Sequence, residues 1–102
     1  MKLFTKKIKE NTPALRTTNA LPPDQVKIQF KLFTPDGAAT WYITEANFDS
    51  GEAFGLCDLG YGAELGYVNL NKLQAVRGNF GMKIERDLYY SGTLADAMAA
   101  QR

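Results

Sequence analysis

The sequence predicts an α+β fold: an antiparallel four- to five-stranded meander sheet with short N-terminal, inserted and C-terminal helices. Three observations lead to this fold class. Several short segments alternate apolar with polar residues at the period of a strand. Turn signals rich in glycine, proline and aspartate separate these segments by only a few residues. Capping residues precede short runs whose apolar residues have helical spacing.

The first expected element is a helix over residues 2–11. Basic and apolar residues alternate there, Thr5 supplies a capping hydroxyl, and Pro13 stops the helix. A helix packed on a sheet is the ordinary meaning of such a segment, and contact with nucleic acid or a lipid surface is the functional alternative. The polar residues 16–25, which include two prolines, are expected to form a loop.

The clearest predicted strand covers residues 26–32, with one face buried and the other in water. The turn sequence Thr34-Pro35-Asp36-Gly37 follows, and residues 39–44 alternate again. The two segments therefore predict an antiparallel hairpin. The alternating apolar residues are Val26, Ile28, Phe30 and Leu32 in the first strand, and Ala39, Trp41 and Ile43 in the second.

The next part of the chain continues the meander. A reversal at residues 49–51 leads into a third strand over residues 53–59, and a Gly-Tyr-Gly turn at residues 60–62 leads into a fourth strand over residues 64–68. The glycines of this region indicate positive φ angles or close packing. They do not indicate a phosphate-binding loop, because no Gly-Lys-Ser/Thr sequence follows them.

Two helices and a last strand complete the predicted fold. Asn69 is placed to cap a short helix that closes one end of the sheet. Residues 84–90 are predicted to form the last strand. Thr93 and Asp96 have capping-box spacing ahead of a helix over residues 94–101.

The composition indicates a single folded domain spanning residues 1–102. Hydrophobic residues make up 45% of the chain and charged residues 23%, which gives enough apolar surface for one modest core. No apolar run reaches the roughly 18 to 20 residues that a membrane span needs, and residues 1–16 lack the apolar centre of a signal peptide. We therefore expect a cytoplasmic protein that makes no membrane contact.

The residue types that most enzymes use for acid–base and metal chemistry are scarce. Histidine is absent and Cys57 is the single cysteine, which excludes histidine-based triads, multi-thiolate metal sites and an intrachain disulfide. Glu45, Asp58 and Glu64 come from consecutive predicted strands and raise a divalent-cation site as an alternative, but no calcium-loop spacing accompanies them. We predict a protein that is not an enzyme and has no catalytic, metal or cofactor site.

The net charge of +1 hides an uneven distribution along the chain. Residues 1–31 contain seven basic and two acidic side chains, whereas residues 32–71 contain six acidic side chains and no lysine or arginine. Such asymmetry can steer a charged partner, unless folding interleaves the two segments in space.

The acidic segment is also rich in aromatic residues, and we predict that it binds a macromolecular partner, with a protein as the favoured class. Outside this segment, the triplet Glu85-Arg86-Asp87 has two interpretations: a structural ion pair, or a contact in which Arg86 anchors the partner. The predicted partner-binding residues are Tyr42, Glu45, Asp49, Glu52, Asp58, Tyr61, Glu64 and Arg86. The oligomeric state stays open.

Nucleic-acid binding through the basic N-terminal part of the chain is the alternative function. Aromatic side chains on a sheet can stack on single-stranded bases, but here the strands that carry them are acidic, and single-strand binders need a basic groove. The alternative therefore relies on the basic residues alone. They are Lys2, Lys6, Lys7, Lys9, Arg16, Lys27 and Lys31.

Several short sequences resemble a family of short bacterial proteins. They are Phe33-Thr34-Pro35, Trp41-Tyr42-Ile43-Thr44-Glu45, Phe54-Gly55-Leu56, Glu64-Leu65-Gly66-Tyr67 and Ile84-Glu85-Arg86-Asp87-Leu88-Tyr89. The family is one of unknown function, common on plasmids, conjugative elements and phages, where its members accompany DNA-transfer and anti-defence genes. The resemblance covers nearly the whole chain. It implies an accessory protein of a mobile element, with a host-defence complex as a candidate partner, and it assigns no role to any residue.

Overall fold

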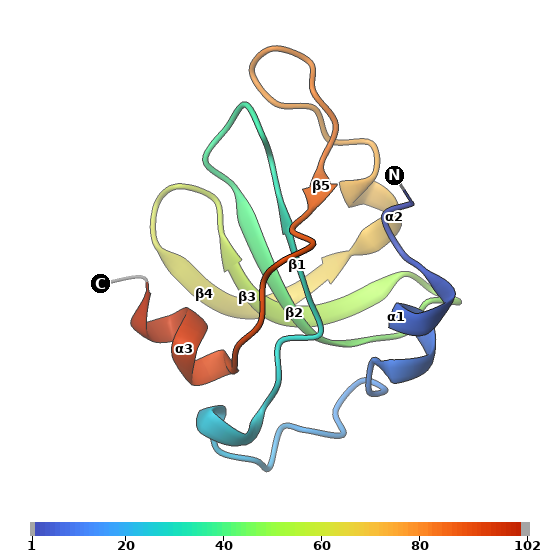
Figure 1. The fold of residues 1–102 in the computed structure, drawn as a ribbon, viewed down its shortest axis with the longest axis vertical. Helices are drawn as coiled ribbons and strands as arrows, with labels where there is room; N and C mark the ends of the chain where they lie inside the picture. Colours follow the sequence, from blue (N-terminus) through green and yellow to red (C-terminus); the bar gives the residue numbers. More distant parts are fainter. Residues whose placement is uncertain (1, 101–102) are drawn as a thin grey trace.

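The computed structural model describes residues 2–100, which form the predicted α+β fold: a five-stranded antiparallel sheet with three short α-helices (Figure 1). The strand order is β4-β3-β2-β1-β5, so the first four strands form the predicted meander and β5 returns beside β1. The strands are β1 (Phe30–Phe33), β2 (Thr40–Ala46), β3 (Glu52–Asp58), β4 (Ala63–Asn69) and β5 (Glu85–Arg86). The helices are α1 (Lys6–Asn11), α2 (Leu70–Leu73) and α3 (Leu94–Ala99), with a 3-10 turn, η1, at Pro23–Gln25.

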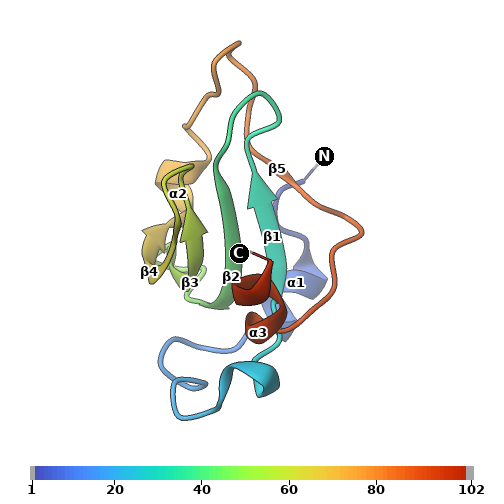
Figure 2. The same cartoon turned by 90° about the vertical axis from the view of Figure 1, so that its left-hand side faces the viewer.

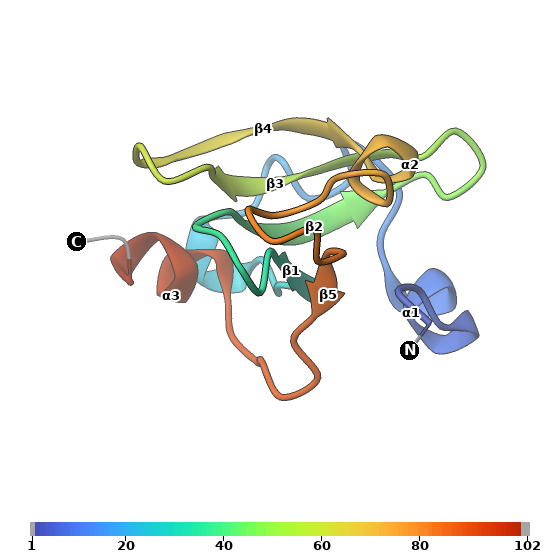
Figure 3. The same ribbon diagram turned by 90° about the horizontal axis from the view of Figure 1, so that it is seen from above.

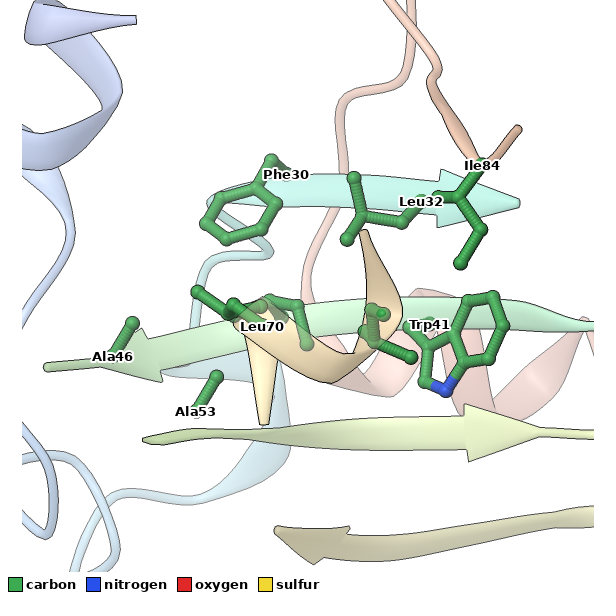
Figure 4. Packing of buried hydrophobic residues seen from close by; sticks show 9 residues of the cluster. Phe30, Leu32, Trp41, Ala46, Ala53, Leu70 and Ile84 are labelled. Atoms are coloured by element: carbon green, nitrogen blue, oxygen red, sulfur yellow. The ribbon is translucent and has the colours of Figure 1, made fainter. Parts of the chain in front are cut away.

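One face of the sheet carries the larger hydrophobic core, and we call it the Trp41 face. Register places Trp41 beside Leu32 on one side and Cys57 on the other, so these side chains share this face. Helix α2 lies over this face, as Figure 4 shows, and its buried residues Leu70 and Leu73 belong to the cluster. The buried residues of this cluster are Phe30, Leu32, Trp41, Ile43, Ala46, Ala53, Leu70, Leu73 and Ile84.

The opposite face, which we call the Tyr42 face, is covered by α3. Its buried cluster contains Val26, Ile28, Tyr42, Leu56, Leu94 and Ala97. Strand β2 is therefore buried on both faces from Trp41 to Ala46. The alternation of apolar and polar residues therefore gives this strand no exposed face, because α2 covers one side and α3 with the loop at residues 16–18 covers the other.

The first predicted strand is also shorter than expected. Val26 and Ile28 are buried on the Tyr42 face, whereas Phe30 and Leu32 are buried on the Trp41 face. The backbone N–H of Ile28 donates to Gly92 O at 2.9 Å, and regular pairing with β2 begins only at Phe30. The strand is thus interrupted between Ile28 and Phe30, and the alternating apolar residues before and after the interruption lie on opposite faces of the sheet.

The ends of the chain contain smaller corrections. Helix α1 has the predicted Thr5 cap but begins at Lys6. The predicted strand over residues 84–90 is reduced to β5, because Asp87 Oδ1 accepts a hydrogen bond from Tyr89 N and turns the chain. Helix α3 has the predicted capping box and ends at Ala99, and the predicted end at residue 101 lies outside the described residues.

A contact between two distant turns fixes one end of the molecule. The β1–β2 turn and the loop over residues 78–82 run side by side in Figures 1 and 2. Asp36 Oδ2 accepts hydrogen bonds from Phe80 N at 2.6 Å and Met82 N at 3.2 Å. The predicted turn signal at Asp36 is confirmed, since Gly37 N donates to Thr34 O at 3.2 Å. The carboxylate also joins this turn to a segment more than 40 residues away.

Within residues 2–100, none of the helices has the length and apolar character to cross a membrane.

Candidate partner-binding site

The β4 strand forms one outer edge of the sheet. It contains seven residues, Ala63–Asn69, and pairs with β3 along its whole length. In Figure 3, β4 is the outer margin of the sheet, and within residues 2–100 no strand pairs with its other side. The opposite edge strand, β5, has only two residues.

The positions of the hydrogen-bonded residue pairs in the β3–β4 hairpin show which backbone groups of β4 face outward. Leu70 N donates to Gly51 O at 2.7 Å, and Asn47 N donates to Glu52 O at 2.8 Å. Because backbone groups of successive residues point to opposite sides of a strand, Glu64, Gly66 and Val68 direct theirs toward β3. The N–H and C=O groups of Leu65 and Tyr67 therefore point away from the sheet.

Large apolar side chains gather on this edge and on the adjoining turn. Tyr61 is 96% exposed at the tip of the β3–β4 hairpin, where Gly60 and Gly62 have the positive φ angles of 102° and 119° that the turn prediction requires. Leu65 is 48% exposed and Tyr67 is 50% exposed. A contiguous group of exposed apolar side chains is typical of an interaction site.

An open groove of about 520 Å³ runs along the same hairpin beside the Trp41 face. Cys57 and Glu64 are partners in the β3–β4 register and both face the groove side of the sheet. Gly66 leaves the groove open, because a Cβ atom added there would meet no atom within 4 Å. The groove is lined by Trp41, Cys57, Leu59, Tyr61, Gly62, Ala63, Glu64, Leu65, Gly66, Tyr67 and Val68.

Four predicted acidic residues lie along the β2–β3–β4 part of the sheet. Asp58 and Glu64 are close to the Tyr61 turn, since Asp58 pairs with Ala63 in the register. Glu52 lies at the other end of β3, and Asp49 is exposed in the β2–β3 turn. The acidic segment of the sequence thus stays together in space, but folding also brings one basic residue to it, because Arg16 lies over the Tyr67 ring of β4.

Glu45 is buried and does not belong to the predicted partner-binding surface. Its side chain is 2% exposed, and its carboxylate accepts hydrogen bonds from Arg16 N at 2.7 Å, Thr18 N at 2.8 Å and the Thr18 hydroxyl. Burial raises the pKa of this carboxyl, but these hydrogen bonds and the Arg16 charge outweigh burial and lower it. Glu45 pairs with Phe54, far along β3 from Asp58, so the alternative of a cation site shared by Glu45, Asp58 and Glu64 does not fit the fold.

Tyr42 is also buried and cannot belong to an exposed surface. Its side chain is 7% exposed on the Tyr42 face, with its ring 5.5 Å from the Tyr90 ring and Lys31 Nζ above both rings. Burial, followed by Tyr42 and the carboxylates of Asp96 and Asp87, raises the pKa of Tyr90. The prediction placed Tyr42 at the surface because the sequence did not show that α3 covers this side.

Arg86 belongs to the other edge of the sheet. It lies in β5, with three strands between it and β4, so it cannot act together with the β4 residues. Its Nε atom is buried without a hydrogen-bond partner. The predicted ion pair of this triplet forms between Asp87 and Lys31, with Oδ2 3.7 Å from Nζ.

The groups that can carry metal or thiol chemistry are few in the part of the chain that the structure describes. It contains no cluster of three or more histidine, cysteine, aspartate or glutamate side chains placed to hold a metal ion. Burial raises the pKa of the Cys57 thiol, which therefore stays protonated at neutral pH.

The basic residues of the alternative function do not form one surface. Lys6, Lys7 and Lys9 are exposed on α1, which Figures 2 and 3 place beside β1 and β5, away from β4. Lys31 is held by two tyrosine rings and Asp87. The guanidinium carbon of Arg16 lies 5.6 Å from the centre of the Tyr67 ring, on the other side of the molecule.

Comparison with known proteins agrees with the resemblance seen in the sequence. A model of a protein family of unknown function, DUF2958, matches residues 3–100. The chain belongs to the DUF2958 family. No curated protein and no solved structure matches it. The expected membership of a family of unknown function, over nearly the whole chain, is confirmed.

The predicted partner-binding residues did not include Leu65 and Tyr67, which the structure of this DUF2958 protein adds to the candidate site. Leu65 and Tyr67 alternate with Glu64 and Gly66, which predicts a strand but does not show which face is covered. Their exposure follows from the position of β4 at the edge. The signal for that position is the meander itself, whose last strand stays at the edge unless a later strand pairs with it, and β5 pairs with β1 instead.

Proposed function

We propose that this DUF2958 protein is a non-enzymatic accessory protein of a mobile element, and that it binds a protein partner through the β3–β4 hairpin. One observation carries the proposal: Tyr61 in the β3–β4 turn is exposed beside Leu65 and Tyr67, which are exposed on an edge strand whose outer backbone is unpaired within residues 2–100. Tyrosine is enriched among the residues that anchor protein interfaces, and an exposed apolar patch is typical of an interaction site. The association with mobile elements is supported by the resemblance described above.

Charge supports a basic partner surface. The hairpin and the helix start that follows it, residues 52–71, carry Glu52, Asp58 and Glu64 and no lysine or arginine. An acidic face with apolar anchors is complementary to a basic protein surface. A nucleic-acid-binding face of a host-defence complex has this chemistry, and we propose it as the partner class.

The groove chemistry favours contact over catalysis. Glu64 lines the groove beside Cys57, whose thiol is protonated at neutral pH because burial raises its pKa. A general acid–base mechanism needs a second group matched to this carboxylate. The remaining groove residues are apolar or aromatic side chains and glycines.

The proposal can be tested with two matched double variants. The first combines Tyr61→Ala with Glu64→Lys at the β4 edge. The second combines Tyr89→Ala with Glu85→Lys at the β5 edge, where Tyr89 is 93% exposed and so matches Tyr61 in exposure. We expect the partner that copurifies with the wild-type protein to be lost with the first variant only, with both melting temperatures unchanged. Retention of the partner by the first variant would overturn the proposal.

Nucleic-acid binding through α1 remains a second candidate, because the exposed lysines of this helix form a basic patch of their own. A labelled oligonucleotide at low ionic strength tests it. Binding that weakens with added salt and is lost in Lys6→Glu with Lys9→Glu would favour this function. An absence of binding at low salt would exclude it.

A further inference from the structure

We infer that the β4 edge binds an extended segment of its partner protein as an additional antiparallel or parallel strand, and that this segment carries basic side chains. The inference rests on the proposed function and specifies its mode of recognition. It follows from the outward backbone of β4, from the scarcity of edge protection along that strand, and from the charges beside it.

The backbone of β4 provides the attachment. Leu65 and Tyr67 direct their N–H and C=O groups away from β3, because the residues on either side of each are the ones that pair with β3 through hydrogen bonds. The strand is seven residues long, which corresponds to roughly 20 Å of edge. Extended peptides bind such edges through backbone hydrogen bonds, and the side chains at alternate positions supply specificity.

Most features that block an edge strand are missing from β4, whose one charged side chain is Glu64. Proteins protect edges with lysine, proline, bulges or very short strands. Residues 63–69 contain no lysine and no proline, and their register with β3 has no irregularity. The β2–β3 pair, in contrast, shifts register between Ile43 and Glu45. The β4 edge is therefore long, regular and open to pairing.

The two faces of β4 specify different side chains in the added strand. On the Tyr42 face, Leu65 and Tyr67 present apolar surface. On the Trp41 face, Glu64 presents a carboxylate, and the open space above Gly66 leaves room for an incoming side chain. A segment that alternates apolar and basic residues matches both faces.

Charge also separates this occupant from a second copy of the chain. Pairing β4 with itself across a two-fold axis would place both Glu64 side chains on the same face of the joined sheet. Residues 52–71 contain no basic side chain to offset them, and Arg16 lies over the Tyr67 ring, on the face opposite Glu64. A basic partner segment avoids this repulsion and gains attraction instead.

The test uses synthetic peptides of about eight residues, the length that pairs with β4. One alternates lysine with valine, a second alternates glutamate with valine, and a third is the lysine peptide with alternate backbone amides methylated. NMR-detected hydrogen exchange on the full chain measures each amide. We expect the lysine peptide to slow exchange at Leu65 and Tyr67 by at least about tenfold, and the other two peptides to bind at least about tenfold more weakly.

Two protein variants provide an independent measurement. Leu65→Pro removes one outward N–H, at an edge position where proline is tolerated, and Leu65→Ala removes the side chain but keeps that N–H. We expect Leu65→Pro to bind the lysine peptide at least about tenfold more weakly than Leu65→Ala. Leu65→Pro is compared only if its NMR spectrum is that of a folded chain, and the methylated peptide decides the question otherwise.

Each remaining outcome is decisive. No binding of the lysine peptide, or binding that leaves the Leu65 and Tyr67 amides unprotected, overturns strand addition. Concentration-dependent protection of the same amides without peptide assigns the edge to a second copy and also overturns it. If the partner is lost with Tyr61→Ala and Glu64→Lys but no peptide protects β4, strand addition fails while the proposed function stands. If the lysine peptide protects β4 but that variant retains the partner, the proposed function fails instead.

Discussion

The β4 and β5 edges of the sheet differ in length, in cover and in the origin of their exposed side chains. Strand β5 has two residues, and the chain on either side of it is tied down, by Asp36 before the strand and by the ion pair between Lys31 and Asp87 after it. Strand β4 has seven residues in unbroken register with β3. One edge is closed in the ways that proteins use against edge pairing, and the other is left open.

Exposed aromatic side chains alone do not distinguish the two edges. Phe80 and Tyr89 flank β5 and are as exposed as Tyr61. They belong to loops, whereas Leu65 and Tyr67 lie on a strand and direct their own backbone N–H and C=O groups outward. The β4 edge therefore combines outward backbone groups with exposed side chains, and the proposed recognition uses both.

The largest expected effect comes from two glycines that face each other in the β3–β4 register. A Cβ atom at Gly55 would lie 1.9 Å from Tyr42 O, while one at Gly66 would meet nothing within 4 Å. We expect Gly55→Ala to destabilise the fold by about 3 kcal/mol or more, because β2 and β3 must separate. Gly66→Ala should change the free energy of unfolding by less than about 0.5 kcal/mol. Urea unfolding measures both, and equal losses would show that the groove above Gly66 is not open.

The closed edge can be tested through the contact between Asp36 and Gly78. A Cβ atom at Gly78 would lie 1.5 Å from Asp36 Oδ1, which is buried without a hydrogen-bond partner. We expect Gly78→Ala to cost about 1–3 kcal/mol. A double-mutant cycle with Asp36→Ala provides the control, since removing the carboxylate should relieve the clash and make the two effects non-additive. Strict additivity would mean that the carboxylate does not fix this loop.

Glu45 in the interior and Glu64 at the β4 edge allow the same comparison of stability. We expect Glu45→Gln to destabilise the fold by about 1–3 kcal/mol, because it weakens three hydrogen bonds to a buried carboxylate. Glu64→Gln, at an exposed position, should change the free energy of unfolding by less than about 0.5 kcal/mol.

The pH dependence of stability supplies a second test of Glu45. Its folded-state pKa lies below the ordinary value of 4.5, so the unfolded chain binds the proton more tightly. The stabilisation is therefore complete above the unfolded-state pKa and is lost as the pH falls through the folded-state pKa. Thermal unfolding between neutral and acidic pH should show a smaller acid-side loss in Glu45→Gln than in the wild type. An identical profile would contradict the role of this carboxylate.

The sequence predicted those elements whose pattern is local. The hairpin around Asp36, the Thr5 cap and the capping box of α3 depend on residues a few positions apart, and all are confirmed. The first strand was predicted too long because four alternating apolar residues are buried, yet in two different clusters. Alternation records burial, but it does not record which layer covers each residue.

The candidate site depended on contacts that the sequence does not reveal. Glu45 is bonded by residues 27 and 29 positions away in the loop before η1, so it looked like a surface carboxylate. Tyr42 lies on a face that a distant helix covers. Asp58, Tyr61 and Glu64 were predicted together because they sit in one hairpin, and a hairpin keeps sequence neighbours close in space.

The variants with the smallest expected effect on stability compare the two edges through their rates of aggregation. Leu65→Lys places on β4 the charge that protected edges carry, and Leu88→Lys is the matched change at the β5 side, where Leu88 is 59% exposed. Both variants should unfold within about 0.5 kcal/mol of the wild type. Light scattering during prolonged heating below the melting temperature should show slower aggregation for Leu65→Lys alone, because aggregation by edge pairing needs the open backbone of β4. Equal protection by Leu88→Lys would mean that added charge, and not the closing of this edge, governs aggregation.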